Sequence, residues 1–304
     1  MTSRAIQPLR SVLYLPASNS RAIEKARSLP ADAVIFDLED AVAPDAKPQA
    51  RRNLEDAFAT GAVAAGINVI RVNALDCEEF AEDLLTVGRC RPHAMLVPKV
   101  SHPDEVTSIW RSMDAAFGAA VPALWCMIET ASGVQHAERI AVSAHGEGRA
   151  IDCLVIGTND IARETGVSMG QDRQFMLPWL MTAVLAAKAH GLAILDGVWN
   201  DFGDTDGFAA EAMQGRMMGF DGKTLIHPTQ VEPANRIFAP DAETVENARR
   251  IAAAFADPAN AGKGVINMEG RMVELLHLEM AQRVLQKHEA IRSRAGAARD
   301  SDPH

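Results

Sequence analysis

The chain has no long apolar run, no secretory leader pattern and no excess of basic residues. No apolar stretch reaches the roughly 18 residues that suggest a membrane span. The first 16 residues lack an apolar core followed by a small-residue cleavage site. The formal net charge of −10 argues against general nucleic-acid binding, because neutralising phosphates requires a basic face. We therefore expect a cytoplasmic protein without membrane or nucleic-acid partners.

Paired cysteine motifs and nucleotide-binding loops are also absent. The four cysteines form no CxxC pair, and Cys126 and Cys153 lie inside apolar runs. We therefore expect reduced core cysteines rather than disulfides or zinc ligands. No GxGxxG motif or P-loop follows an apolar run, which disfavours a nucleotide-binding open sheet.

Short apolar runs alternate with amphipathic helical segments along most of the chain. Runs of this length predict strands that are buried on both faces. Eight strands, each followed by a helix, predict a (β/α)₈ barrel, with a doubly wound open sheet as the alternative. We expect the barrel to occupy residues 1–239. The expected strands begin at Ser11, Ala33, Asn68, Ala94, Ala123, Cys153, Leu192 and Lys223.

The pattern changes beyond Pro240. Residues 240–292 predict a helix, a short hairpin turning at Glu269-Gly270 and a last helix. We expect this extension to act as a lid over a barrel mouth, either its own or that of a neighbouring subunit. Residues 293–304 lack apolar periodicity, which predicts a disordered tail.

Several of the expected strands end in acidic residues. Because the carboxyl ends of barrel strands meet at one rim, these carboxylates should gather where parallel α/β folds carry out chemistry. Converging carboxylates repel each other unless a cation lies among them, and Mg²⁺ is the simplest candidate. The pattern therefore predicts a metal-dependent enzyme. The acidic residues are Asp37, Glu39, Asp40, Glu129, Asp160 and Asp196.

Glu129 and Asp160 are the predicted metal ligands. They end consecutive strands, and two carboxylates with water leave room on Mg²⁺ for a bidentate substrate such as a 2-oxo acid. The alternative is that each residue caps the helix that follows it. We expect Glu39 and Asp40 to hold metal-bound water in the catalytic site. Asp196 has a similar supporting role or anchors a loop.

Two cationic residues lie within or at the end of apolar runs. Arg71 in NVIRVN has a planar fork that suits a substrate carboxylate, and a salt bridge to Asp37 or Glu39 is the alternative. Lys99 ends the fourth strand, where we expect it to balance the carboxylates, with a Schiff-base role as the alternative. His227, in LIHP, is expected to be structural.

An ordered set of motifs resembles the citrate lyase beta-subunit family of acyl-CoA lyases, within the aldolase and citrate lyase superfamily. The resemblance runs from Arg10 to Ile291. In chain order the motifs are RSVLYLPASNSRAIEKA, VIFDLEDAV, IRVN, VPKV, MIET, IGTND and GFDGKTLIHPTQV.

This resemblance implies a Mg²⁺-dependent (β/α)₈ barrel that forms a homotrimer or homohexamer and binds acyl-CoA and 2-oxo acids. It implies that Glu129 and Asp160 hold the metal and that Arg71 holds the oxo-acid carboxylate. Arg10 and Lys25 match positions that contact coenzyme A. The family also offers an acidic residue from the extension to a neighbouring active site. In this chain the segment reads GRMVE, so Glu274 stands where Asp is usual.

The working hypothesis is reversible carbon–carbon cleavage of a 3-hydroxy-3-carboxyacyl-CoA, such as malyl-CoA or citramalyl-CoA, into acetyl-CoA and a 2-oxo acid. Glu274 would act as the base on the thioester methyl group in the reverse direction. Two alternatives are thioester hydrolysis of the same substrates and a citrate lyase subunit that works on an acyl-carrier protein. A CoA-free aldolase acting on pyruvate is a further alternative.

Overall fold

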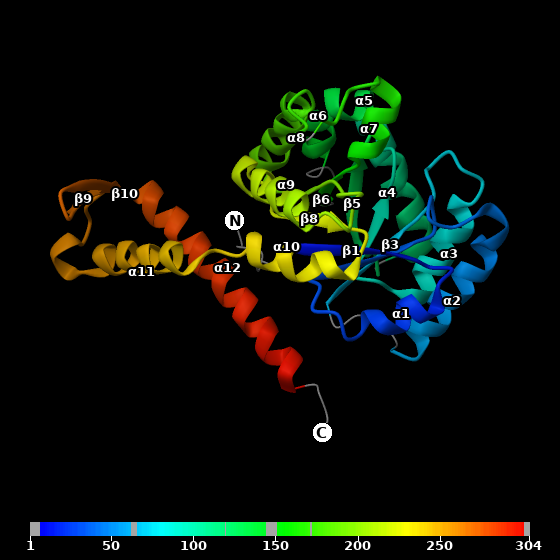
Figure 1. Ribbon diagram of the computed structural model, residues 1–304, viewed down its shortest axis with the longest axis horizontal. Coiled ribbons are helices and arrows are strands. Elements are labelled where there is room, and N and C mark those ends of the chain that lie inside the picture. Colours follow the sequence, from blue (N-terminus) through cyan, green and yellow to red (C-terminus); the bar gives the residue numbers. More distant parts are fainter. Residues whose placement is uncertain (1–6, 62–65, 119, 144–150, 171, 301–304) are drawn as a thin grey trace. The chain divides into compact units, whose positions relative to one another are not determined.

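The computed structural model describes residues 7–61, 66–118, 120–143, 151–170 and 172–300 (Figure 1). The chain divides into two compact units, one spanning Leu9–Phe238 and one formed largely by residues 239–304. The division falls next to the barrel boundary expected at residue 239. Each unit is described by itself below.

Eight parallel strands form a closed barrel in the first unit, which confirms the predicted fold class. Each strand pairs with the next along the chain, and β8 pairs with β1 to complete the ring. The strands are β1 (Ser11–Pro16), β2 (Ala33–Asp37), β3 (Ile67–Arg71), β4 (Ala94–Val97), β5 (Ala123–Ile128), β6 (Ile151–Ile156), β7 (Ala193–Asp196) and β8 (Gly222–Leu225).

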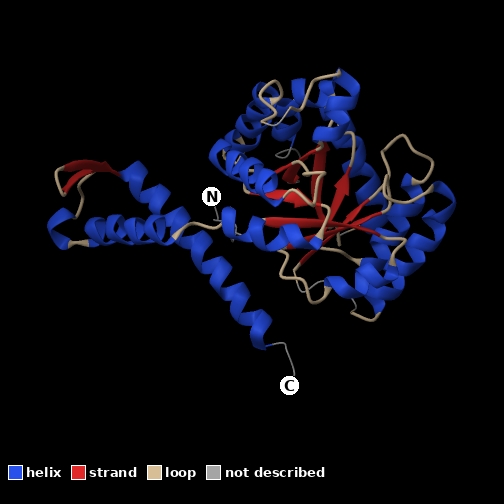
Figure 2. Ribbon diagram, in the orientation of Figure 1, coloured by secondary structure: helices blue, strands red, loops and turns tan. Residues whose placement is uncertain are grey.

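Helices surround the strands, as Figure 2 shows. All the connections from strand to strand run through helical segments, as parallel pairing requires. The barrel unit contains α1 (Ser20–Ala26), α2 (Lys47–Ala59), α3 (Phe80–Cys90), α4 (Pro103–Phe117), α5 (Ala131–Gln135), α6 (Ala137–Val142), α7 (Thr158–Thr165), α8 (Leu177–Ala189), α9 (Thr205–Met218) and α10 (Val231–Ile237).

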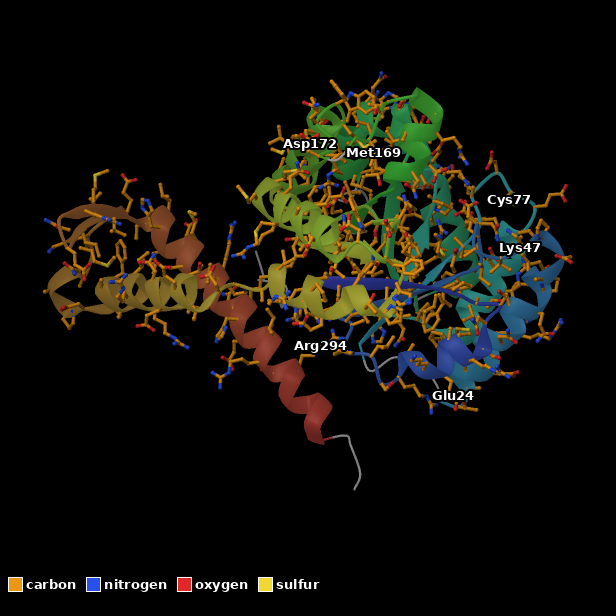
Figure 3. All side chains as sticks on the ribbon, in the orientation of Figure 1. Glu24, Lys47, Cys77, Met169, Asp172 and Arg294 are labelled. Atoms are coloured by element: carbon orange, nitrogen blue, oxygen red, sulfur yellow. The ribbon has the colours of Figure 1, made fainter. Side chains whose placement is uncertain are left out.

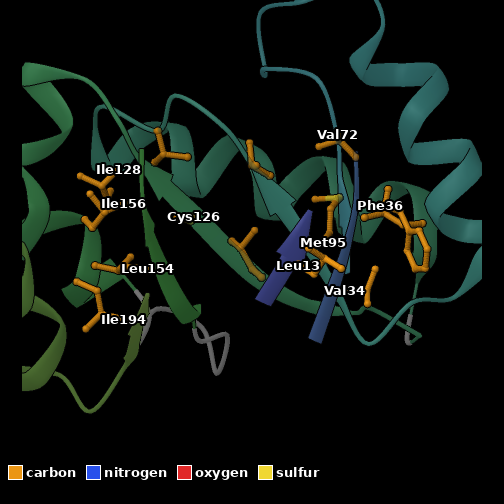
Figure 4. Close-up of a cluster of buried hydrophobic side chains, with 14 of the residues drawn as sticks. Leu13, Val34, Phe36, Val72, Met95, Cys126, Ile128, Leu154, Ile156 and Ile194 are labelled. Carbon is orange, nitrogen blue, oxygen red and sulfur yellow. The ribbon is translucent and has the colours of Figure 1, made fainter. Parts of the chain in front are cut away.

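Apolar side chains fill both faces of the barrel wall. On β2, Val34 and Phe36 belong to the cluster between the strands and the helices, part of which is drawn in Figure 4. Ala33 and Ile35 alternate with them and belong to the cluster inside the barrel. Since neither face meets water, the strands are unbroken apolar runs in the sequence. The polar residues that interrupt these runs are therefore exceptions that need partners.

The second unit consists of α11 (Ala242–Ala256), the hairpin strands β9 (Val265–Met268) and β10 (Arg271–Glu274), and α12 (Leu275–Asp300). The hairpin turns at the predicted residues, because Glu269 and Gly270 both have positive φ, at 53° and 80°. Two such residues are typical of the tight turn that matches strand twist. The expected disordered tail differs, since α12 continues to residue 300; residues 301–304 lie outside the described residues.

The cysteines and the helices bear on two expectations drawn from the composition. All four cysteines are free; Cys90, Cys126 and Cys153 are buried, whereas Cys77 is exposed. Among the described residues, no helix combines the length and apolar character that crossing a bilayer requires.

The barrel closes where β8 meets the start of β1. The backbone N–H of Lys223 donates to the backbone oxygen of Arg10 at 3.2 Å. A Cβ atom added to the preceding Gly222 would lie only 1.7 Å from the backbone oxygen of Leu9. Glycine is therefore required for the two strands to approach each other.

We predict that Gly222→Ala destabilises the barrel by about 3 kcal/mol or more, because backbone rather than a flexible side chain blocks the added methyl group. Gly203→Ala in the same unit is the matched control, since the one atom that its added Cβ would approach within 4 Å is the flexible side-chain oxygen of Asp201 at 3.2 Å. All four tryptophans lie in the barrel unit, so tryptophan fluorescence during urea unfolding measures that unit. Equal unfolding midpoints for the two variants would contradict the prediction.

Candidate active site at the carboxyl ends of the barrel strands

Side chains at the carboxyl ends of five neighbouring strands, β1 to β5, form one cluster. Strand alternation directs Asp37 and Arg71 into the interior, and both are buried. Glu129 follows β5 and is also buried, whereas Tyr14 and Met127 are the next inward residues on their strands. These five residues, with the loop residues Glu39 and Lys99, define the mouth cluster.

Arg71 is fixed by two carboxylates. Its Nε and Nη2 atoms donate to the two Asp37 oxygens at 2.7 and 2.6 Å, a bidentate pair. Its Nη1 lies 2.8 Å from Glu39 Oε2, although the angle is that of an ion pair without a hydrogen bond. The structure thus shows the salt bridges that were the alternative for Arg71, and it leaves Nη1 as the weakly held end of the fork.

Lys99 has a strained backbone that serves the cluster. Its φ of 56° is rare for a residue with a side chain and costs on the order of 1 kcal/mol. In this conformation the Lys99 N–H donates to Glu129 Oε1 at 2.8 Å. The ammonium group contacts Glu39 and lies 3.9 Å from Asp40 Oδ1. These contacts fit the expected charge-balancing role.

Glu129 carries a buried oxygen that nothing in the described part of the chain satisfies. Oε2 has no hydrogen-bond partner there, whereas Oε1 accepts from Lys99. Burial, reinforced by the carboxylates of Glu39 and Asp160, raises the pKa of Glu129 to about 8. A Cβ atom on Gly157 would lie 2.5 Å from Oε2, so glycine there leaves room for the carboxylate. A buried carboxylate oxygen without a donor is a place where a cation binds.

Asp160 completes the predicted pair of metal ligands. It lies in the first turn of α7, is 16% exposed and contacts Arg163. Its charge contributes to the raised pKa of Glu129, so the two carboxylates act on the same region. Among the described residues, no group of three or more His, Cys, Asp or Glu side chains could hold a metal ion. The residues therefore fit Mg²⁺ only as two carboxylates, with water or substrate supplying the other ligands.

A cavity of about 310 Å³ adjoins the mouth cluster beside Lys99. The segments after β3, β4 and β5 line it, including residues 74–76 and 97–101. The segment after β3 is anchored to α3. The backbone N–H of Asn73 and its side-chain amide both donate to Asp83 Oδ2, at 2.7 and 2.6 Å. Lys47 of α2, labelled in Figure 3, contacts the Asn73 amide oxygen. The cavity thus has a fixed wall next to the reactive groups.

Arg10 lies at the opposite end of the barrel. It directly precedes β1, whereas the mouth cluster follows the strands. Its Nε and Nη2 atoms donate to the carboxylate of Asp32 at 2.8 and 2.9 Å, and that carboxylate is completely buried. The guanidinium is thus occupied by Asp32 at the end of the barrel away from the mouth, and the expected coenzyme A contact of Arg10 stays a prediction. Its geometry indicates a role in barrel stability.

Asp196 also belongs to a separate network. It accepts from Arg173 at 2.6 and 2.9 Å and from Lys223 at 3.1 Å, and Lys223 also donates to Glu211 at 2.7 Å. Burial alone would raise the pKa of Asp196, but Lys223 and Arg173 outweigh it and hold the pKa below its ordinary value. These paired charges favour the second role considered for Asp196, which is to anchor a loop, over support of the metal site.

The remaining predicted residues are not brought to the cluster by the described contacts. Lys25 is exposed in the last turn of α1. His227 caps the short helix that begins at Pro228 and stacks on Phe202, with ring centroids 4.9 Å apart. Glu274 ends β10 in the second unit, where its backbone N–H donates to His277. The roles of Lys25 and Glu274 stay predictions.

Tyr14 belongs to the cluster although it is not among the residues predicted from the sequence. Its ring lies 5.0 Å from the Arg71 guanidinium carbon, and its hydroxyl is 3.8 Å from the sulfur of Met127. A signal was available, since Tyr14 is the one tyrosine of the chain and interrupts an apolar strand with a hydroxyl.

Comparisons with known proteins give a consistent set of relatives. A model of the HpcH/HpaI aldolase/citrate lyase family matches residues 10–228. The chain is 46% identical over 284 residues to (3S)-malyl-CoA thioesterase of Cereibacter sphaeroides, covering 93% of this chain and 96% of that protein. It is 32% identical over 304 residues to L-malyl-CoA/beta-methylmalyl-CoA lyase of Rhodobacter capsulatus, covering 92% and 94%.

A solved structure, CitE of Mycobacterium tuberculosis in complex with magnesium, acetoacetate and coenzyme A, is similar to the chain with a TM-score of 0.72. The sequence identity is 27%, and the alignment covers 94% of this chain and 99% of that chain.

We predict that Arg10→Met destabilises the barrel by about 3–5 kcal/mol, because it removes the bidentate partner of the buried Asp32. The KM for an acyl-CoA ester should stay unchanged, since Arg10 lies at the other end of the strands. Arg89→Met is the matched control, because that arginine forms an exposed pair with Glu55 and should change stability little. Urea unfolding and steady-state kinetics measure the two effects. A raised KM with unchanged stability would favour the binding role.

We predict that the metal-free barrel loses stability as the pH rises. The folded-state pKa of Glu129, about 8, lies above the ordinary value of 4.5. Stability from the protonated carboxyl is therefore fully present below pH 4.5 and is lost as the pH rises through 8. Relative to Glu129→Gln, which stays neutral, the wild type should lose on the order of a few kcal/mol across this range. Urea unfolding of the wild type and of Glu129→Gln, each in buffer with a metal chelator and over a series of pH values, measures the difference. Identical dependence of stability on pH in the two proteins would refute the prediction.

Proposed function

Because the chain belongs to the HpcH/HpaI aldolase/citrate lyase family, we propose that it is a Mg²⁺-dependent enzyme that hydrolyses a hydroxy-dicarboxylic acyl-CoA thioester such as malyl-CoA. The observation that carries this proposal is the 46% identity to (3S)-malyl-CoA thioesterase along nearly the whole of both chains. The sequence alone favoured carbon–carbon cleavage first. The similarity reverses that order and keeps cleavage as the second candidate.

Glu129 and Asp160 would hold the metal. The unsatisfied Oε2 of Glu129 and the part-exposed carboxylate of Asp160 provide hard oxygen ligands on adjacent strand ends. Bound Mg²⁺ would act as a Lewis acid that stabilises negative charge on a substrate oxygen. Glu129 must be ionised to bind a cation, so metal binding at neutral pH should release a proton from it.

Arg71 would orient the substrate through a carboxylate. Asp37 holds the guanidinium from one side, which leaves Nη1 directed away from that bidentate pair. A substrate carboxylate at Nη1 would gain a charge-assisted hydrogen bond in place of the contact with Met127 sulfur at 3.8 Å, and it would compete with the poorly angled ion pair to Glu39 at 2.8 Å. Orientation of this kind raises the rate because the reacting carbonyl is held in one position.

In hydrolysis, water adds to the thioester carbonyl, the carbon–sulfur bond breaks, and the thiol leaves with a proton. A carboxylate must accept the proton of the water. Glu39 is held by Arg71 and Lys99 on its two oxygens, whereas Asp40 is 57% exposed with Lys99 at 3.9 Å. Asp40 is therefore better placed than Glu39 to exchange protons with water. Glu274 of the second unit is the other proposed base.

The second candidate is cleavage of the carbon–carbon bond of the same ester into acetyl-CoA and a 2-oxo acid. The 32% identity to a malyl-CoA/beta-methylmalyl-CoA lyase favours it. The same ligands and the same arginine would serve, because both reactions place negative charge on a substrate oxygen.

The proposed assembly is a homotrimer or homohexamer in which the second unit covers a neighbouring active site. Met272, Leu275, Leu276 and Met280 of that unit are about half exposed or more in the single chain. Exposed apolar groups of this kind are typical of a surface that another chain covers. Light scattering coupled to gel filtration measures the assembly size.

We predict that the purified protein with Mg²⁺ and malyl-CoA releases malate and free coenzyme A in equal amounts. Thiol titration and chromatography of the acids measure both products. Formation of a 2-oxo acid and acetyl-CoA in their place would establish the second candidate. Turnover only with an acyl-carrier protein would favour a citrate lyase subunit.

We predict that Glu129→Gln lowers kcat/KM by at least about two orders of magnitude, because it removes a charged metal ligand while keeping the shape. Glu138→Gln on α6 is the matched control, since that residue is exposed and pairs with His190. Stabilisation by Mg²⁺ in thermal unfolding should disappear in the first variant and persist in the second. Full activity of Glu129→Gln would refute the metal assignment.

A further inference from the structure

Tyr14 is built into the barrel mouth beneath Arg71. It points into the barrel interior from β1, with the apolar Val12 two residues before it on the same face. The Arg71 guanidinium carbon lies 5.0 Å from the centre of its ring. This cation–π contact holds the guanidinium from the face that Asp37 does not touch.

Two hydrogen-bond donors in this region share one poor acceptor. The Tyr14 hydroxyl and Arg71 Nη1 each lie 3.8 Å from Met127 Sδ. A thioether sulfur is a weak acceptor, and 3.8 Å is a long contact even for sulfur. Nε and Nη2 of Arg71 have short bonds to the Asp37 oxygens, whereas Nη1 faces Glu39 Oε2 at 2.8 Å in an ion pair without hydrogen-bond geometry. The two donors therefore converge on a point where an oxygen anion would bind better than sulfur does.

The hydroxyl is not explained by packing. A phenylalanine would supply the same ring to Arg71 without burying a polar group on so weak an acceptor, which is costly. Burial, against the opposing effect of Arg71, raises the pKa of Tyr14 above its ordinary value, so the hydroxyl keeps its proton and can donate. A neutral donor also leaves the charge balance of the mouth unchanged.

We propose that Tyr14 is a substrate-binding residue whose hydroxyl donates, together with Arg71 Nη1, to one carboxylate oxygen of the substrate. The inference rests on the proposed function, which supplies a substrate with a carboxylate. The unbranched Met127 side chain occupies this point in the free protein and rotates away when the oxygen arrives. Tyr14 thereby distinguishes acids from their neutral esters.

The single tyrosine allows a direct test. Protein made with 3-fluorotyrosine has one fluorine-labelled site, so its ¹⁹F NMR spectrum contains one signal from the fold. With Mg²⁺ present, pyruvate should shift this signal. Half of the maximal shift should occur at the dissociation constant that calorimetry gives. Methyl pyruvate, which lacks the charge, should leave the signal in place. A signal that does not move when calorimetry shows bound pyruvate would overturn the Tyr14 assignment while leaving the proposed function intact.

A variant supplies the energetic test. Tyr14→Phe keeps the ring under Arg71, so the unfolding midpoint and the affinity for Mg²⁺ alone should match the wild type. The dissociation constant for pyruvate should rise roughly tenfold, the usual effect of losing a hydrogen bond to a charged group. An unchanged dissociation constant would overturn the assignment. No pyruvate binding to wild-type protein by calorimetry would overturn this inference, whereas the proposed function is tested separately by the release of malate and coenzyme A from malyl-CoA.

Discussion

The site depends on the balance of charge at the barrel mouth. Arg71 and Lys99 neutralise Asp37 and Glu39 through short contacts, which makes it possible to bury these groups at the strand ends. Glu129 receives only a backbone N–H, and its pKa is raised because burial and neighbouring carboxylates act on it together. A site that pairs every carboxylate except one is prepared for a cation at that one.

Backbone geometry delivers these charges to one place. Gly157 leaves space for the Glu129 carboxylate, and the positive φ of Lys99 turns its N–H onto the same group. At the far end, Gly222 lets β8 approach β1 so that the ring can close. Closure is a condition for the site, because strand ends from the whole ring converge only in a barrel.

The sequence predicted the eight strands well, because barrel strands are apolar on both faces and form recognisable runs. It also offered a salt bridge from Arg71 to Asp37 or Glu39 as an alternative to substrate binding, and both contacts are present. It could not show that Arg10 is occupied by Asp32, because a residue next to a strand gives no indication of its partner. The conformation of Lys99 and the meeting of Tyr14 with Met127 depend on tertiary contacts that no local pattern encodes.

The two candidate reactions require different things of the same mouth. Both place negative charge on a substrate oxygen, so a metal at Glu129 and Asp160 with Arg71 nearby suits either. Hydrolysis further needs a water beside the thioester carbonyl and a carboxylate to take its proton, whereas carbon–carbon cleavage needs a base at the hydroxyl group and a dry enolate. Asp37 and Glu39 of the mouth cluster are already held by cations, whereas the adjoining Asp40 is 57% exposed. The choice of reaction therefore depends on the identity of the base, for which the solvent-exposed Asp40 and the proposed Glu274 are the two candidates.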